Sequence, residues 1–233
     1  MRVRHVRDSS AGYKSIDEFN LLLVEHFMCD VRFLNNAHNK IKEWTSGLEI
    51  APKIAFDIGA NVGLYSLMLA KFLPDCMIYA FEPVRSNFDI LKTHVEVNCL
   101  NERIMIYNFG LWSKDTEMSL GMPKGKNIGN TGLYSSFHSN EVCVVQAQFR
   151  VLDSWCRENN VWPDFMKIDA EGAEFEILSS SPGCLSKAKR IITEYNVKDN
   201  DLPDPKLISS ILNEQGFIGA LDSHSSDDMI WTK

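Results

Sequence analysis

The sequence predicts an α/β fold with a mostly parallel sheet, and three observations lead to this prediction. From residue 53 onward, short apolar runs alternate with amphipathic segments of helical length, as they do in βαβ units. A glycine-rich turn at residues 57–63 joins the first apolar run to the first of these helices. Acidic residues follow several of the apolar runs, at the positions where strands are expected to end.

The first 50 residues are expected to form an N-terminal helical extension. Apolar side chains recur at helical spacing over residues 15–46, from Ile16 and Phe19 to Ile41 and Trp44. We interpret this stretch as one or two helices packed ahead of the main domain, which occupies residues 51–233.

The main domain alternates strands and helices. The predicted strands are 54–56, 77–81, 104–107, 165–168 and 190–193, and the predicted helices are 62–72, 84–97, 152–159, 173–178 and 205–215. Residues 217–221 and 228–232 are expected to pair as a closing antiparallel hairpin.

An insertion interrupts this alternation at residues 113–150. Residues 121–132 are rich in Gly, Asn and Lys and indicate a loop, with strand character on both sides at 117–120 and 142–150. We expect a β-hairpin that sits on the domain rather than a second domain, and loops of this size are often functional.

The composition narrows the function classes. The chain has 233 residues, 45% of them hydrophobic, with a net charge of −7, which is ordinary for a globular protein and argues against broad binding to nucleic acid or anionic membrane. No apolar run approaches the roughly 18 residues of a membrane helix. The basic start lacks the apolar run of a signal peptide, and the six cysteines are scattered, so we expect a cytoplasmic protein with reduced thiols. A homo-oligomer is left open.

The glycine-rich turn is expected to bind a nucleotide-like cofactor. Gly59 and Gly63 permit a tight turn and the close approach of a ligand to the backbone. The carboxylate of Asp57 ahead of the turn repels a pyrophosphate but attracts a cationic sulfonium. Glu82, 25 residues later at the end of the second strand, is placed to accept both ribose hydroxyls of an adenosine. Together these residues favour S-adenosylmethionine, whereas a helix-capping Asp57 and a solvated Glu82 form the structural alternative.

A second polar cluster follows the fourth predicted strand. Lys167 and Asp169 are two residues apart and share one face of that strand, Glu171 follows in the turn, and Gly172 permits the close approach of a ligand. Our hypothesis makes Asp169 the base or the group that orients the acceptor hydroxyl, with Glu171 second and Lys167 as the third catalytic candidate. The alternative is a helix-capping Asp169 in a plain ion pair with Lys167.

These motifs resemble the FkbM-type S-adenosylmethionine-dependent O-methyltransferases. The resemblance covers roughly residues 50–200 and rests on Phe56-Asp-Ile-Gly-Ala-Asn-Val-Gly63, Phe81-Glu-Pro83, Val151-Leu-Asp-Ser-Trp155 and Asp164-Phe-Met-Lys-Ile-Asp-Ala-Glu-Gly-Ala-Glu174, with Glu194 at the next strand end. It implies a class I methyltransferase, Rossmann-like fold with a mostly parallel seven-stranded sheet and a closing antiparallel strand. The implied activity is methyl transfer to a hydroxyl, often on a sugar, glycan or polyketide.

The resemblance also implies which residues contact the cofactor. The methionine and ribose side is expected along the glycine turn, Glu82 is expected to hold the ribose, residues 108–113 are expected to border the adenine, and Asp169 is expected near the methyl group. The resulting cofactor set is Asp57, Gly59, Ala60, Asn61, Gly63, Glu82, Pro83, Asn108, Gly110, Ser113 and Asp169.

Three further points stay open at this stage. Asp169, Glu194 and Asn196 carry oxygen ligands suited to Mg²⁺, although Glu194-Tyr195-Asn196 departs from the usual acid-Asn pair, so a divalent cation is not favoured. An RNA 2′-hydroxyl methyltransferase would use similar Lys, Asp and Glu chemistry, but this acidic chain lacks an obvious basic face. A catalytically inactive cofactor-binding module acting through partners is the remaining alternative to an enzyme with a small-molecule or carbohydrate acceptor.

Overall fold

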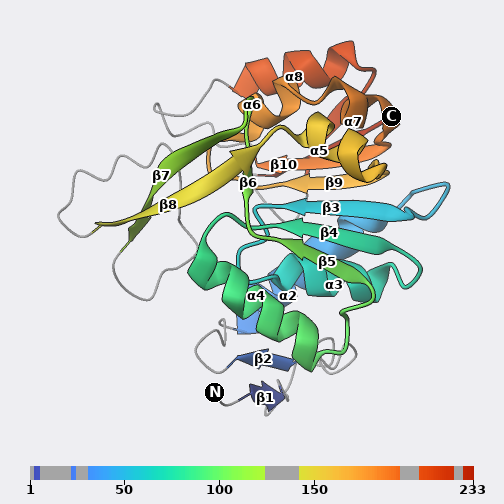
Figure 1. The fold of residues 1–233 in the computed structure, drawn as a ribbon. Helices are drawn as coiled ribbons and strands as arrows, with labels where there is room; N and C mark the ends of the chain where they lie inside the picture. The colour runs from blue at the N-terminus through green and yellow to red at the C-terminus, as the bar shows by residue number, and fades with distance from the viewer. Residues whose placement is uncertain (1–2, 6–21, 25–30, 124–141, 195–204, 223–227) are drawn as a thin grey trace.

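The computed structural model describes residues 3–5, 22–24, 31–123, 142–194, 205–222 and 228–233. Its centre is a seven-stranded sheet in the order β11-β12-β10-β9-β3-β4-β5 (Figure 1). All strands run parallel except β12, which pairs antiparallel with both β10 and β11. The mostly parallel sheet and the closing antiparallel hairpin are thereby confirmed. The strands are β3 (Ile54–Ile58), β4 (Met77–Phe81), β5 (Ile104–Tyr107), β9 (Phe165–Ile168), β10 (Arg190–Glu194), β11 (Ile218–Leu221) and β12 (Asp228–Thr232).

Helices cover both faces of the sheet. One layer holds α2 (Val31–Thr45), α3 (Leu64–Phe72) and α4 (Arg85–Val97), and the other holds α5 (Leu152–Asn159), α6 (Glu174–Ser179), α7 (Pro182–Lys187) and α8 (Pro205–Glu214). Because successive strand residues point to opposite faces, Ala55 packs in the first layer while Phe56 and Ile58 pack in the second. The central strand β3 is therefore apolar on both sides, as expected inside a parallel sheet, whereas the edge strand β11 is largely exposed.

The N-terminal region differs from the helical expectation. The described helix begins only at Val31, whereas β2 (Leu22–Val24), expected within a helix, pairs antiparallel with β1 (Val3–His5). A short apolar run such as Leu22-Leu23-Val24 fits either periodicity, and its pairing partner lies outside the window in which helical spacing was read. Residues 6–21 and 25–30 lie outside the described chain. Among the described residues, no helix is both long and apolar enough to cross a membrane.

The insertion is a β-hairpin, as predicted. β7 (Thr116–Pro123) pairs antiparallel with β8 (Val142–Arg150), and β6 (Gly110–Leu111) runs parallel to β8 at its far end. The resulting ribbon projects from the sheet (Figure 1). β7 continues past Gly121, so the strand is longer than expected, and most of the predicted loop, residues 124–141, lies outside the described chain.

Candidate functional site

The candidate site lies where the strand order of the sheet reverses. From β3 the chain continues to β4 and β5 on one side, whereas β9 and β10 lie on the other, with their crossover helices in opposite layers. In open α/β sheets, ligands bind outside the carboxyl ends of the strands at this reversal. The polar residues at the strand ends, predicted from five separate segments, share this edge: Asp57, Glu82, Asn108, Asp169 and Glu194.

The glycine turn after β3 is shaped by its neighbours within the fold. Gly59 and Gly63 have φ angles of 75° and 87°, and Asn61 between them also lies in the left-handed region at 51°. A Cβ atom at Gly59 would lie 1.8 Å from the carbonyl oxygen of Asp169, and one at Gly63 would lie 2.3 Å from Cδ1 of Leu91. The sequence argument explained these glycines by a tight turn and by ligand approach, and the carbonyl of Asp169 and the side chain of Leu91 are a further reason for them.

Asp57 is fully buried beside this turn. Asp57 lies opposite Lys167 in the parallel register of β3 and β9. The carboxylate accepts a hydrogen bond from Ser66 Oγ at 2.5 Å and lies 3.2 Å from Lys167 Nζ. Its charge is thus compensated inside the fold. The contacts tie Asp57 to α3 and β9, and the expected attraction of a sulfonium by its carboxylate stays a prediction.

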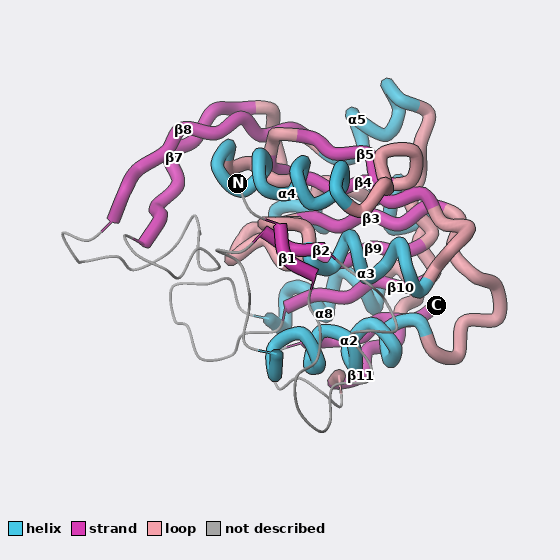
Figure 2. Tube along the Cα trace, turned by 90° about the horizontal axis from the view of Figure 1, so that it is seen from below, coloured by secondary structure: helices cyan, strands magenta, loops and turns pink. Residues whose placement is uncertain are grey.

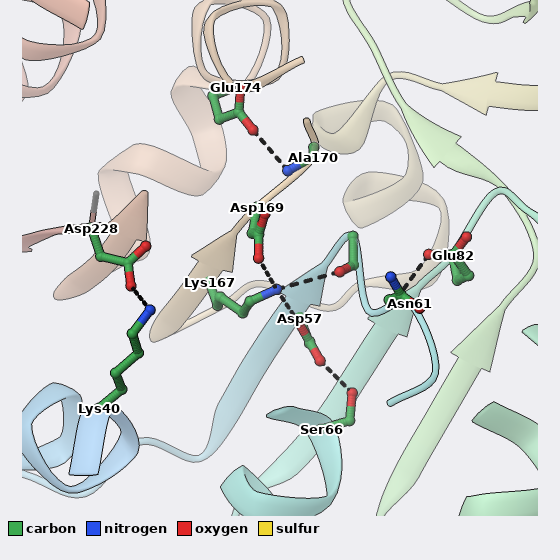
Figure 3. Close-up of polar contacts among 11 residues, drawn as sticks. Lys40, Asp57, Asn61, Ser66, Glu82, Lys167, Asp169, Ala170, Glu174 and Asp228 are labelled. Atoms are coloured by element: carbon green, nitrogen blue, oxygen red, sulfur yellow. Dashed lines mark hydrogen bonds and ion pairs between the residues drawn. The ribbon is translucent and has the colours of Figure 1, made fainter. Parts of the chain in front are cut away.

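Lys167 joins the two central strand ends. Its ammonium is 3% exposed and lies 3.3 Å from Asp169, and it donates a hydrogen bond to the carbonyl of Gly59 at 3.3 Å (Figure 3). Burial opposes the charge, but Asp169 and Asp57 raise the pKa of Lys167 above its ordinary value. The two carboxylates therefore favour the charged form of Lys167, and the ion pair places its ammonium where it can orient Asp169.

Glu82 is built into the loop after β4. Its carboxylate is 4% exposed and accepts the main-chain N–H groups of Asn61 and Val84, each at 2.8 Å. Burial raises the pKa of Glu82 to about 7, against the effect of these hydrogen bonds. Asn108 Nδ2 donates to the carbonyls of Glu82 at 2.9 Å and Pro83 at 3.2 Å. The loop is thus held from both neighbouring strands.

Of the remaining predicted cofactor residues, Ala60 lies in the glycine turn, and Gly110 and Ser113 lie next to the hairpin. Ala60 is buried in the glycine turn, where its N–H donates to Phe81, and Ser113 is half-buried just after β6. A Cβ at Gly110 would lie 2.3 Å from the Phe149 ring, so hairpin packing alone demands a glycine there. The hairpin base also packs against the segment after Glu82 through a small apolar cluster: Val84, Leu120, Ala147 and Phe149.

The acids after β9 and β10 are more open. The Asp169 side chain is 40% exposed, and Glu171 and Glu194 are half-buried. Burial and then the nearby Asp169 raise the pKa of Glu171 to about 7 and that of Glu194 to about 8. Within the described chain, neither carboxylate receives a hydrogen bond. The sequence analysis named Glu194 only as a candidate metal ligand and as part of the family resemblance. Its position at the end of a predicted strand was the signal that it belongs to the same cluster of acids as Asp169 and Glu171.

Sequence reasoning gave no role to Glu174. Its carboxylate is 6% exposed and accepts the N–H groups of Ala170 at 2.7 Å and Gly172 at 3.0 Å. These bonds fix the turn in which Glu171 takes a left-handed φ of 51°. Burial raises the pKa of Glu174 to about 7. The available signal was an acid in the first turn of the next helix, where main-chain N–H groups need acceptors.

The described residues do not form a set of ligands for a metal ion. Asn196 lies outside the described residues, and among those described no group of three His, Cys, Asp or Glu side chains is placed to hold an ion. A divalent cation at the ends of β9 and β10 was left open and not favoured by the sequence, and it stays untested.

Comparison with known proteins places this geometry among methyltransferases. The sequence profile of the Methyltransferase FkbM domain matches residues 57–218, which is more than half of the chain. The chain is 26% identical over 144 residues to Methyltransferase 1 of Beauveria bassiana, covering 52% of this chain and 55% of that protein. It is 25% identical over 180 residues to the 2-O-methyltransferase NoeI of Sinorhizobium fredii, covering 71% and 72%.

The same fold occurs in a solved structure, methyltransferase FkbM from Methylobacillus flagellatus. The TM-score is 0.60 at 17% identity, covering 84% of this chain and 48% of that one. The chain therefore spans about half the length of this protein and of the Beauveria relative. At this identity the likeness shows the fold.

Proposed function

Because the chain belongs to the FkbM methyltransferase family, we propose that it is an S-adenosylmethionine-dependent O-methyltransferase acting on a hydroxyl of a sugar, glycan or other small molecule. The observation that carries this proposal is the arrangement around Asp169. One oxygen of this half-exposed carboxylate is tied to the buried Lys167 ammonium, beside the glycine turn. A carboxylate held in this way can orient or deprotonate a hydroxyl at the edge where the cofactor is expected.

The residues at the ends of β3, β4 and β5 fit S-adenosylmethionine, which supplies an electrophilic methyl group. Each oxygen of Glu82 accepts one main-chain N–H at 2.8 Å, and a carboxylate can accept about four hydrogen bonds. Oε1 also accepts the side-chain amide of Asn87 at 3.5 Å, so the capacity left for a ribose hydroxyl lies mainly on Oε2. Asn108 fixes the backbone at Glu82 and Pro83, so this loop does not need to reorganise on binding.

The acids at the ends of β9 and β10 account for the proton. As the acceptor oxygen forms its new bond to carbon and the sulfur–carbon bond breaks, the hydroxyl proton must leave. Asp169 is the first candidate to orient the hydroxyl and take its proton, and Glu171 is the second. Glu171 and Glu194 have pKa values raised to about 7 and about 8, near the range that suits proton transfer at neutral pH.

The relatives support oxygen as the accepting atom. One of them carries the name 2-O-methyltransferase and matches this chain over 71% of its length. An RNA 2′-hydroxyl acceptor fits less well, because the net charge of −7 does not favour binding to a polyanion.

Two measurements test the proposal. Calorimetry with S-adenosylhomocysteine is expected to show binding to the purified chain. Absence of binding would exclude both the small-molecule and the RNA methyltransferase hypotheses and favour an inactive module. Incubation with methyl-labelled S-adenosylmethionine and fractionated glycan, lipid and metabolite extracts is then expected to label a carbohydrate or small-molecule fraction. Label appearing only in RNA would overturn the acceptor class while retaining the cofactor.

A further inference from the structure

An aromatic contact connects the helix α2 to the buried ammonium of the candidate site. Trp44, at the end of α2, stacks on Tyr65 of α3 with ring centroids 5.2 Å apart and planes 27° apart. The Lys167 ammonium lies over the same Tyr65 ring, 5.0 Å from its centroid. The path from Trp44 through Tyr65 to Lys167 thus ends 3.3 Å from Asp169. α2 lies outside the family match, which begins at residue 57.

The buried Lys167 ammonium is stabilised by several surrounding groups. It is almost completely buried, and a buried charge is costly unless several groups surround it. Two carboxylates and one carbonyl lie between 3.2 and 3.3 Å, and the Tyr65 ring completes the surroundings. A desolvated ammonium over an aromatic face is a favourable contact. Burial raises the pKa of the Tyr65 hydroxyl, so the ring stays uncharged.

Trp44 is itself held rigidly. Its side chain is 1% exposed, and its indole N–H donates to Asp222 at 2.7 Å. The Arg190 guanidinium donates to the Trp44 carbonyl at 2.9 Å. One turn earlier on α2, Lys40 pairs with Asp228 at 2.5 Å (Figure 3). Helix α2 packs against α3 and runs beneath the sheet near the C-terminal strands (Figure 2). The stack therefore rests on an anchored element.

We propose that Tyr65, held in place by Trp44, is a positioning residue that fixes the Lys167 ammonium and through it the Asp169 carboxylate. The importance of this contact for methyl transfer rests on the proposed function, whereas the contact itself can be tested without an acceptor. A hydroxyl group is not required for it, because the ammonium faces the ring.

The test measures the Lys167 ammonium by ¹⁵N NMR in the whole chain, where a buried ammonium is visible because its protons exchange slowly. Tyr65→Leu and Trp44→Leu are expected to speed this exchange roughly 3- to 30-fold, the range expected for loss of a cation–π contact. Tyr65→Phe retains the ring and is expected to keep the exchange rate of the native chain. Lys167→Met identifies the resonance.

Phe72→Leu is the matched control. Phe72 is a half-buried aromatic residue on the same helix, and it contacts His38 of α2 edge-on with centroids 5.3 Å apart. Its replacement is expected to leave the exchange rate of the Lys167 ammonium unchanged. The circular dichroism spectrum is expected to show the native fold in every variant. Unchanged exchange in both leucine variants of the stack, or equal acceleration in Phe72→Leu, overturns the proposal. If Tyr65→Leu does not fold, Trp44→Leu decides alone.

A second readout connects the contact to catalysis. With a labelled acceptor in hand, Tyr65→Leu is expected to lower kcat about tenfold while Tyr65→Phe restores it. Equal kcat in the leucine and phenylalanine variants contradicts the positioning role. Failure of the proposed function shows separately, as absence of S-adenosylhomocysteine binding by the native chain, and leaves the exchange result intact.

Discussion

The two halves of the candidate site treat their carboxylates differently. The donor half consists of the ends of β3, β4 and β5. Its glutamate after β4, Glu82, is 4% exposed and accepts hydrogen bonds from two main-chain N–H groups. The acid half consists of the ends of β9 and β10, and its acids Asp169, Glu171 and Glu194 are all half-buried. Within the described chain, no N–H group donates to Glu171 or Glu194.

We expect this difference to separate binding from proton transfer. A carboxylate tied to the main chain has a fixed position and suits recognition, as expected for Glu82 and a ribose. The pKa values of Glu171 and Glu194 are raised to about 7 and about 8 and that of Glu82 also to about 7, so the halves differ in exposure and anchoring: the two acids of the acid half are more open and are not held by main-chain N–H groups of the described chain. Lys167 lies between the halves and contacts Asp57 on one side and Asp169 on the other.

The largest expected effect separates the halves by function. Asp169→Asn removes the candidate base without changing its size, and turnover is expected to fall about 10²- to 10⁴-fold. Binding of S-adenosylhomocysteine, measured by calorimetry, is expected to persist because the donor half is intact. Glu171→Gln serves as the comparison within the acid half, with a smaller loss. Native turnover in Asp169→Asn would remove this residue from catalysis.

The second effect concerns the residue that joins the halves. Lys167→Met leaves the buried Asp57 without its counter-charge, and breaking a buried ion pair costs about 3–5 kcal/mol in the free energy of unfolding. Urea denaturation measures this loss. Lys40→Met is the control, because its pair with Asp228 is at the rim, where each side chain is about 15% exposed, and a smaller loss is expected. Equal losses in the two variants would contradict the larger contribution to stability expected for Lys167.

A matched pair of buried glutamates sharpens the comparison further. Glu82 and Glu174 each accept two main-chain N–H groups, so Glu82→Gln and Glu174→Gln are each expected to cost about 1–3 kcal/mol of stability. Only Glu82→Gln is expected to weaken S-adenosylhomocysteine binding, by about tenfold, in calorimetry. Equal weakening in both variants would show that turn geometry, and not contact with the ribose, controls affinity.

The smallest expected effect is a pH dependence in the acid half. The pKa of Glu194 rises from 4.5 to about 8 on folding, so between these values the folded chain binds more protons than the unfolded chain. Stability contributed by this group is therefore lost as pH rises from about 4.5 to 8. Glu194→Gln is expected to gain at most about 1 kcal/mol over the native chain at pH 8 and less at pH 5.5, measured by urea denaturation. A gain independent of pH contradicts the assignment.

The sequence predicted the core elements closely because their signals are local. β4, β5 and β9 have their predicted bounds, since short β-rich runs bounded by polar residues leave little choice. β2 was assigned to a helix because three apolar residues carry no period of their own. α7 was not predicted, because Pro182–Lys187 is too short to show a helical repeat, although Pro182 begins it.

Within the site, the sequence could predict the members and the ion pair of Lys167 with Asp169, which lie two residues apart, but not the partners that come from other strands. Acids at the ends of parallel strands must share one edge, which follows from topology alone. The pairing of Asp57 with Lys167 depends on β3 and β9 being neighbours in the sheet, although more than 100 residues separate them. The demand for Gly59 comes from the same adjacency, through the Asp169 carbonyl. Such contacts are long-range and leave no local pattern.

The chain leaves the domain for the hairpin and returns to it at almost the same point. β6 pairs with the last residues of β8, and Trp112 donates to the Arg150 carbonyl at 3.0 Å, so the two ends of the insertion are already joined by hydrogen bonds. Loop-closure entropy grows only slowly with length once the ends are fixed. The outer part of the ribbon can therefore be shortened, lengthened or exchanged while its base, which packs on Val84 and Gly110, keeps the donor half in place. It is the natural point at which to test whether the insertion selects the acceptor.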